Sequence, residues 1–116
     1  MSRRKSHALS ADQLGAVAGL FRVLAEPSRL ALLQALQAGP LTVTALIDAC
    51  GMKQANVSKH LAVLHQHQLV KRTPRGAAVE YEIADPIIFS LCNLVCGKIE
   101  SDAKRTAALF GEPNGS

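Results

Sequence analysis

Two cysteines four residues apart, Cys92 and Cys96, have the spacing needed to bind a soft ion. At positions i and i+4 of a helix, side chains lie on one face a turn apart, so both sulfurs can reach the same thiophilic ion. A trigonal ion such as arsenite needs a third thiolate, from Cys50 or from a partner chain. The alternative is core packing, because free cysteine is among the most buried residue types.

The pair is therefore a candidate site for arsenite, another thiophilic metal ion or a sulfur-based effector, and no cofactor is expected to be required. Cys50 is the weaker candidate, because a cysteine beside Gly51 is more often a small side chain packed next to a turn. Three cysteines cannot all pair within one chain, so no disulfide framework is predicted.

A second chemical feature is a stretch without acidic residues. Asp and Glu are absent from residues 49–79, which contain the cations Lys53, Lys59, Lys71, Arg72 and Arg75. Such a block can neutralise a polyanion. Nucleic acid is favoured over a membrane surface, because the block includes Gly, Pro and a predicted hairpin instead of a basic amphipathic helix. A solvated face with chance clustering is the alternative.

The spacing of apolar residues and the capping signals predict the elements that position these side chains. The expected helices cover about 11–25, 27–38, 43–49, 54–65 and 86–109, and strands at 69–73 and 79–83 form a hairpin. Ser10 with Gln13 resembles a capping box, Thr42 and Asp85 can cap helices, and Gly51 suits a left-handed helix end. The fold class is mainly α with a small β-hairpin: about five helices and a two-stranded wing.

A short helix, a tight turn at Gly51 and a second helix with a polar, basic face form a helix-turn-helix pattern, which the following hairpin extends to a winged helix. The second helix can enter a DNA major groove, where Gln54 and Asn56 address base edges while Ser58 and Lys59 hold phosphates. The candidate DNA-binding residues are Lys53, Gln54, Asn56, Ser58, Lys59, His60, Lys71, Arg72, Arg75 and Gly76.

Several of these residues have plainer alternatives. Ser58 is otherwise a surface hydroxyl, Arg75 a solvated charge, and His60 a packed or surface histidine. His65 and His67 are two residues apart at the end of a helix and face apart, which favours surface histidines over a metal site.

Three segments, in order, resemble the ArsR/SmtB family of bacterial winged-helix repressors. They are FRVLAEPSRL at 21–30, QANVSKHLAVL at 54–64, and LVKR at 69–72 with Arg75-Gly76. The resemblance covers roughly residues 11–99. It implies a homodimer that binds its operator without ligand and releases it on binding an effector.

The chain departs from the family pattern at the helix cap and at the usual effector sites. Lys53 stands where the family usually has a Ser or Thr cap, and its ammonium cannot accept from the free N–H groups. The cysteine pair of the third helix is absent from residues 45–49, and Gln34 stands about where a persulfide-sensing cysteine belongs. Asp85 is followed by Pro86, and no His occurs beyond His67, so the zinc-type ligand set is missing as well.

The length of 116 residues, with 48% hydrophobic residues, four aromatics and no Trp, indicates one small domain that gains from oligomerisation. The last helix has an apolar stripe of Ile88, Leu91, Cys92, Val95, Ile99, Ala103 and Thr106, which predicts a dimer made by this helix and the first. We expect a flexible basic arm at 1–9, a DNA-binding and dimerisation domain at 10–110, and a flexible tail at 111–116.

The function indicated is a homodimeric, cytoplasmic transcriptional repressor that binds an inverted repeat in double-stranded DNA, with no membrane partner. The alternative is a winged-helix module that binds a protein or RNA without sensing an effector. An enzyme is not expected, because no nucleophile has a positioned base and Cys92 with Cys96 lacks the spacing of a redox CxxC motif.

Overall fold

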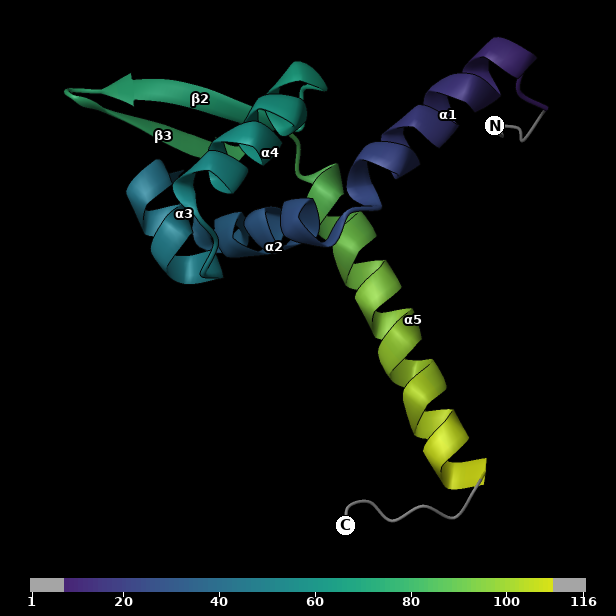
Figure 1. Ribbon diagram of the computed structural model, residues 1–116. Helices are drawn as coiled ribbons and strands as arrows, with labels where there is room; N and C mark the ends of the chain where they lie inside the picture. The colour runs from purple at the N-terminus through teal and green to yellow at the C-terminus, as the bar shows by residue number, and fades with distance from the viewer. Residues whose placement is uncertain (1–7, 110–116) are drawn as a thin grey trace. The chain divides into compact units, whose positions relative to one another are not determined.

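The computed structural model describes residues 8–109, which form two compact units (Figure 1). The first unit ends at Ala84 and the second begins at Asp85. The first unit contains α1 (Ala11–Leu24), α2 (Pro27–Ala35), the short 3-10 helix η1 (Leu36–Ala38), β1 (Leu41–Thr42), α3 (Val43–Cys50), α4 (Gln54–Gln66), β2 (Val70–Arg75) and β3 (Ala78–Ile83). The second unit contains α5 (Ile87–Leu109). The five predicted helices and the hairpin are confirmed.

The helices begin where the capping signals predicted. Ser10 and Gln13 form a reciprocal capping box: the Ser10 hydroxyl accepts from the Gln13 N–H at 3.1 Å, and the Gln13 side chain accepts from the Ser10 N–H at 2.7 Å. The Thr42 hydroxyl accepts from the Ala45 N–H at 3.2 Å. At α5, an Asp85 carboxylate oxygen accepts from the Ile87 N–H at 3.0 Å. Each bond satisfies a backbone donor that the helix itself leaves free.

The sheet has one strand more than the sequence predicted. β1, β3 and β2 lie in that order as an antiparallel sheet, in which Leu41 pairs with Tyr81. β2 and β3 form the expected hairpin, which extends beyond the helices in Figure 1. The expected loop at 74–77 is shorter in the structure, because β2 continues to Arg75 and only Gly76 and Ala77 form the turn. Gly76 has φ 63°, a left-handed conformation that favours glycine.

The core of the first unit is aliphatic and lies between α2, α3, α4 and the start of β2. Its fully buried side chains are Leu32, Leu33, Leu36, Leu46, Val57, Leu61, Leu64 and Val70. Val57, Leu61 and Leu64, which recur at helical spacing along α4, are all buried. These three side chains fix which face of α4 points inward and leave the opposite face to solvent.

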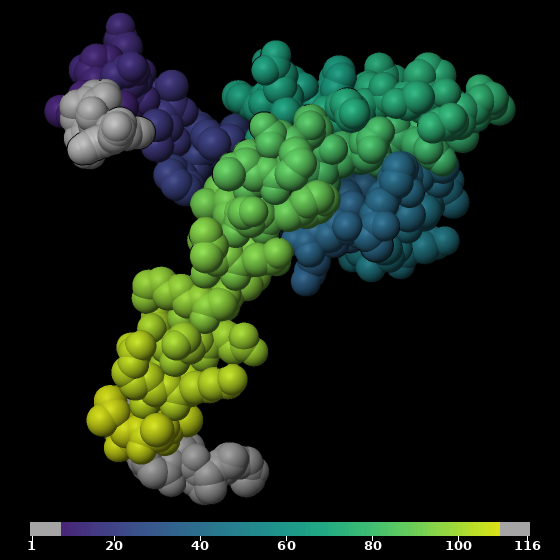
Figure 2. Space-filling model, turned by 180° about the vertical axis from the view of Figure 1, so that it is seen from behind, coloured from purple at the N-terminus to yellow at the C-terminus, as the bar shows by residue number. Residues whose placement is uncertain are grey.

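The second unit is a single helix, seen in light green to yellow in Figure 2. Several of its large apolar side chains are exposed, including Leu94 at 72% and Ile99 at 64%. Among residues 8–109, none of the helices combines the length and the apolar content that crossing a lipid bilayer requires. The expected arm at 1–9 lies outside the described residues except for Ala8 and Leu9, and the tail at 111–116 lies outside them entirely.

Candidate nucleic-acid interface

The α3–turn–α4 segment forms the predicted helix-turn-helix. Gly51 ends α3 with φ 68°, and its N–H donates to the Ile47 carbonyl at 2.9 Å. α4 begins three residues later, and its N-terminal half has one polar exposed face. The exposed residues of this face are Lys53, Gln54, Asn56, Ser58 and Lys59. Five of the predicted DNA-binding residues are thus exposed around the N-terminal half of α4, on the side away from the core, which we call the α4 face, although Gln54 and Asn56, two residues apart, point to different parts of it.

The N-terminus of α4 lacks a side-chain cap. Lys53 occupies the cap position and makes no capping hydrogen bond, as its ammonium chemistry predicted. The free N–H groups of the first turn therefore keep the positive end of the helix dipole unneutralised by protein groups. With Lys53 and Lys59 exposed on the same face, the local potential favours an anion such as a DNA phosphate.

His60, predicted as a DNA-binding residue with a packed histidine as one alternative, is not part of this exposed face and is packed. It is only 7% exposed and points inward. The Nη1 of Arg29 lies 3.3 Å from the His60 Nδ1, and the His60 Nε2 lies 3.8 Å from the Glu26 Oε1. Helical periodicity alone predicts the burial of His60. It is three residues after Val57 and four before Leu64, so it shares their buried face. Its polar type suggested otherwise.

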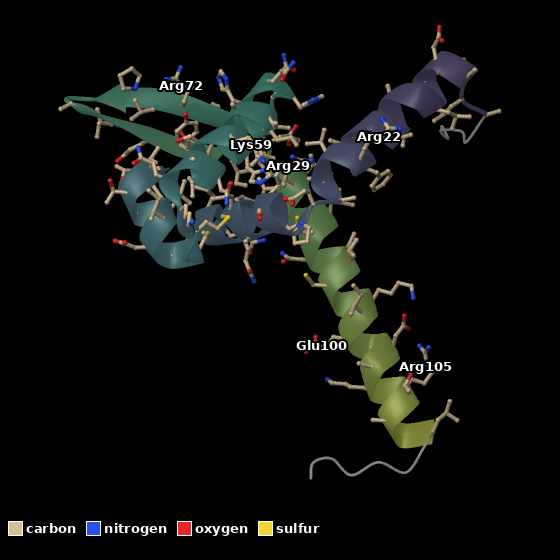
Figure 3. All side chains as sticks on the ribbon, viewed as in Figure 1. Arg22, Arg29, Lys59, Arg72, Glu100 and Arg105 are labelled. Atoms are coloured by element: carbon tan, nitrogen blue, oxygen red, sulfur yellow. The ribbon has the colours of Figure 1, made fainter. Side chains whose placement is uncertain are left out.

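The wing carries the predicted cations, but two of them face carboxylates. Arg75 pairs with Glu80, with 3.2 Å between Nε and Oε1, and Lys71 lies 3.8 Å from Glu82. Arg72 lies exposed on β2 (Figure 3). It makes no ion pair within residues 8–109. Because neighbouring residues of a strand face opposite sides, Arg72 points away from the side that carries both ion pairs.

The wing is therefore less basic than its cations alone suggested. Three cations and two carboxylates, Glu80 and Glu82, leave the hairpin with one net positive charge. The pairs are solvent-exposed and stabilise the hairpin only weakly, so a phosphate can compete with the carboxylates for Arg75 and Lys71. Arg72 needs no such exchange, which makes it the best placed of the three for a backbone contact.

The cysteines divide into one packed thiol and one pair. Cys50 donates a hydrogen bond from Sγ to the Ala31 carbonyl at 3.6 Å, linking α3 to α2, and burial raises the pKa of its thiol. Cys92 is half-buried and Cys96 exposed, one turn apart on α5. Burial, and to a lesser extent repulsion from Cys96, raises the pKa of Cys92. Among the described residues, no three His, Cys, Asp or Glu side chains gather as a metal site.

Sequence reasoning did not single out Glu26 and Arg29. Glu26 caps α2, its Oε1 accepting from the Arg29 N–H at 3.0 Å, and this bond is the main reason that the pKa of Glu26 is lowered. Arg29 also donates from Nε to the Val23 carbonyl at 2.7 Å. Glu26 and Arg29 both lie in residues 21–30, the first of the three segments that resemble the family. That resemblance is the sequence signal that could have drawn attention to them.

The exposed α4 face, the helix-turn-helix that holds it and the adjacent wing together define a winged helix-turn-helix DNA-binding protein. A family model described as a helix-turn-helix domain matches residues 24–73. The transcriptional regulator NmtR of Mycobacterium tuberculosis is 39% identical over 88 residues, which are 76% of this chain and 73% of NmtR.

Two solved structures extend the comparison to nearly the whole fold. The antimony-specific transcriptional repressor AntR is 33% identical, with a TM-score of 0.77, over 87% of this chain and 92% of AntR. The homodimeric winged helix-turn-helix domain of Mb0332 from Mycobacterium bovis is 29% identical, with a TM-score of 0.74, over 82% of this chain and 88% of that one. The chain belongs to the ArsR/SmtB family of winged helix-turn-helix transcriptional repressors, a class of DNA-binding regulators and not of enzymes.

Proposed function

We propose that this protein is a homodimeric repressor that reads an inverted-repeat operator through the α4 face and contacts flanking DNA through the wing. The observation that carries the proposal is the α4 face itself: two amides, a hydroxyl and two ammonium groups exposed beside an uncapped helix N-terminus. Gln54 and Asn56 supply the donor–acceptor pairs that distinguish bases in a major groove. Lys53, Ser58 and Lys59 supply phosphate contacts that set the register.

Homodimerisation is proposed from apolar surfaces that each unit leaves exposed. In α1, Leu14 and Phe21 are 55% and 53% exposed, and α5 exposes Leu94, Val95 and Ile99. Apolar side chains repeated along one helix mark an interaction surface. The homodimeric state of the Mb0332 domain supports a second copy of the chain as the partner. A two-fold dimer presents two α4 helices and therefore reads two half-sites about one helical turn apart.

We propose further that the protein is cytoplasmic, that residues 10–110 form its DNA-binding and dimerisation domain, and that it releases DNA when Cys92 and Cys96 bind a thiophilic metalloid of the arsenite class. Arsenous acid exchanges two of its hydroxyl groups for the two sulfurs, and each thiol proton leaves with a hydroxyl as water. A third thiolate would come from the partner chain, because Cys50 is occupied with the Ala31 carbonyl. The similarity to AntR, an antimony-specific repressor, supports this class of effector.

Effector binding would be coupled to DNA release because Cys92 and Cys96 lie on α5, the helix proposed to form the dimer interface. Three-coordinate binding would change how two α5 helices pack and so the spacing of the two α4 faces. A few kcal/mol of differential affinity suffices for release.

The experiment that tests the proposal is selection of duplexes from a random pool, followed by titration of the selected duplex against salt and against RNA competitors. We expect an inverted repeat, strong dependence on salt and weak competition by RNA. Recovery of no preferred duplex, or equal binding to RNA, would contradict operator recognition and favour a module that binds another partner.

A further inference from the structure

Arg29 joins three segments of the first unit at a single point. Its Nε donates to the Val23 carbonyl at the end of α1 at 2.7 Å, and its Nη1 lies 3.3 Å from the His60 Nδ1 on α4. Its own N–H donates to the carboxylate of Glu26, the cap of α2. Figure 3 shows Arg29 near the start of α2, beside α4. A single side chain thus ties the buried side of α4 to α1 and α2.

These contacts also fix the orientation of the His60 ring. A guanidinium has only N–H donors, so the Arg29 bond requires Nδ1 of His60 to be the unprotonated, accepting nitrogen. Nε2 faces the Glu26 Oε1, 3.8 Å away. His60 is therefore held between a guanidinium and a carboxylate, and the described side chains leave no buried polar atom without a partner.

The hydrogen bond between Arg29 and His60 fixes the orientation of α4 in a way that the apolar core does not. Val57, Leu61 and Leu64 bury one side of α4, but apolar packing is non-directional and tolerates small rotations of a helix. A hydrogen bond between fixed partners defines the rotation and the height of the helix. Asn56 lies one turn before His60, so any rotation at His60 moves Asn56 with it.

We infer that Arg29 and His60 are positioning residues that set the orientation of the α4 face without touching DNA. The inference deepens the proposed operator recognition and rests on it for its functional consequence. Base-edge hydrogen bonds need accurate placement, whereas contacts to a phosphate tolerate displacement. Loss of the Arg29–His60 bond should therefore reduce discrimination between sequences more than it reduces general DNA binding.

The test compares His60→Leu, which removes the acceptor, with His60→Asn, whose side-chain oxygen can replace Nδ1. His65→Leu is the matched control, because His65 is exposed on the same helix. Each folded variant is titrated with a duplex selected by the wild-type protein and with a scrambled duplex of equal composition. We expect His60→Leu to lose about tenfold on the selected duplex and little on the scrambled one. His60→Asn and His65→Leu should keep the wild-type ratio.

Arg29→Lys answers the same question if His60→Leu does not fold, since Lys keeps the charge but cannot bridge two acceptors as the guanidinium does. Unchanged discrimination in the folded variants, or equal losses on both duplexes, would overturn the inference. Residual dipolar couplings, measured on the DNA-free proteins, test the positioning role of Arg29 and His60 separately from operator recognition. If wild-type protein prefers no duplex, operator recognition fails. A reorientation of α4 relative to α2 in His60→Leu alone would still support the positioning role, and an unchanged orientation would refute it.

Discussion

The guanidinium of Arg75 pairs with the carboxylate of Glu80 across the β2–β3 hairpin, with 3.2 Å between Nε and Oε1. The wing residue expected to contact DNA is therefore already engaged by an acid of the neighbouring strand. Because the Arg75 side chain is 65% exposed and the Glu80 side chain 31%, water screens the pair, which holds Arg75 only weakly, and a DNA phosphate can replace Glu80. We expect this carboxylate to lower the affinity of the wing for DNA whether or not the pair is formed.

Removing that carboxylate should strengthen binding to DNA of any sequence. We expect Glu80→Gln to bind duplexes about threefold more tightly at low salt, because it removes one negative charge near the phosphates.

Arg75→Ala should weaken binding to all duplexes and reduce the salt slope by about 1. Arg72→Ala should weaken binding more, since Arg72 faces no carboxylate. Anisotropy titrations over a salt series measure all three variants. Weaker binding by Glu80→Gln would mean that Glu80 holds Arg75 in its DNA-binding position.

Charged substitutions on the exposed apolar surface of α5 should prevent dimerisation. Ile99 is 64% exposed, and an Asp at this position would be buried without a partner in a dimer interface. Sedimentation velocity at micromolar protein should give a dimer for the wild type and a monomer for Ile99→Asp. Glu100→Ala changes the adjacent exposed residue and should remain dimeric. A wild-type chain that sediments only as a monomer would refute the proposed assembly.

The Glu26 cap should make stability depend on pH in the acidic range. The hydrogen bond from the Arg29 N–H favours the carboxylate and lowers the pKa of Glu26 from its ordinary value near 4.5. Its contribution is therefore fully present above that ordinary value and is lost as the pH falls through the lowered one. At pH 7 we expect Glu26→Gln to lower the Tm by a few degrees, and the difference should shrink toward pH 3. A constant difference across thermal melts at these pH values would contradict this account.

The cysteine pair should be needed for release of DNA and not for binding. Cys92→Ser and Cys96→Ser, singly, should bind the selected duplex as the wild type does, but stay bound when arsenite or antimonite is added. Cys50→Ser is the control, because its thiol bonds to the Ala31 carbonyl and should matter less for release. Mobility shifts with a panel of thiophilic ions and sulfur oxidants measure the effect. Normal release by both variants with every effective compound would assign the pair to packing.

Local signals predicted most of the fold, because the caps and glycines act over a few residues. Ser10, Thr42 and Gly51 form the bonds or backbone conformations expected of them. β1 was not predicted, because Leu41 and Thr42 are too few to show an alternating pattern and depend on β3 for their pairing. The exposure of the α4 face followed from helical periodicity alone.

Features that depend on contacts between residues distant in the sequence were harder to predict from the sequence. The Arg75–Glu80 pair depends on the hairpin register, which follows from the two-residue turn at Gly76 and not from strand composition. The Arg29–His60 contact joins residues 31 apart in sequence, and no local pattern indicates such a pairing. These contacts determine which cations are available to DNA and why His60 is buried.

The most direct test of the central claim, that the α4 face reads base edges, is duplex selection repeated with Gln54→Ala and Asn56→Ala beside the wild type. Each variant should fold, dimerise and bind non-specific DNA normally, because both side chains are exposed and uncharged. We predict loss of base preference at one symmetric pair of positions for each variant, costing about 1 to 3 kcal/mol at the contacted base. If both variants select the wild-type sequence with undiminished preference, the α4 face does not read the operator.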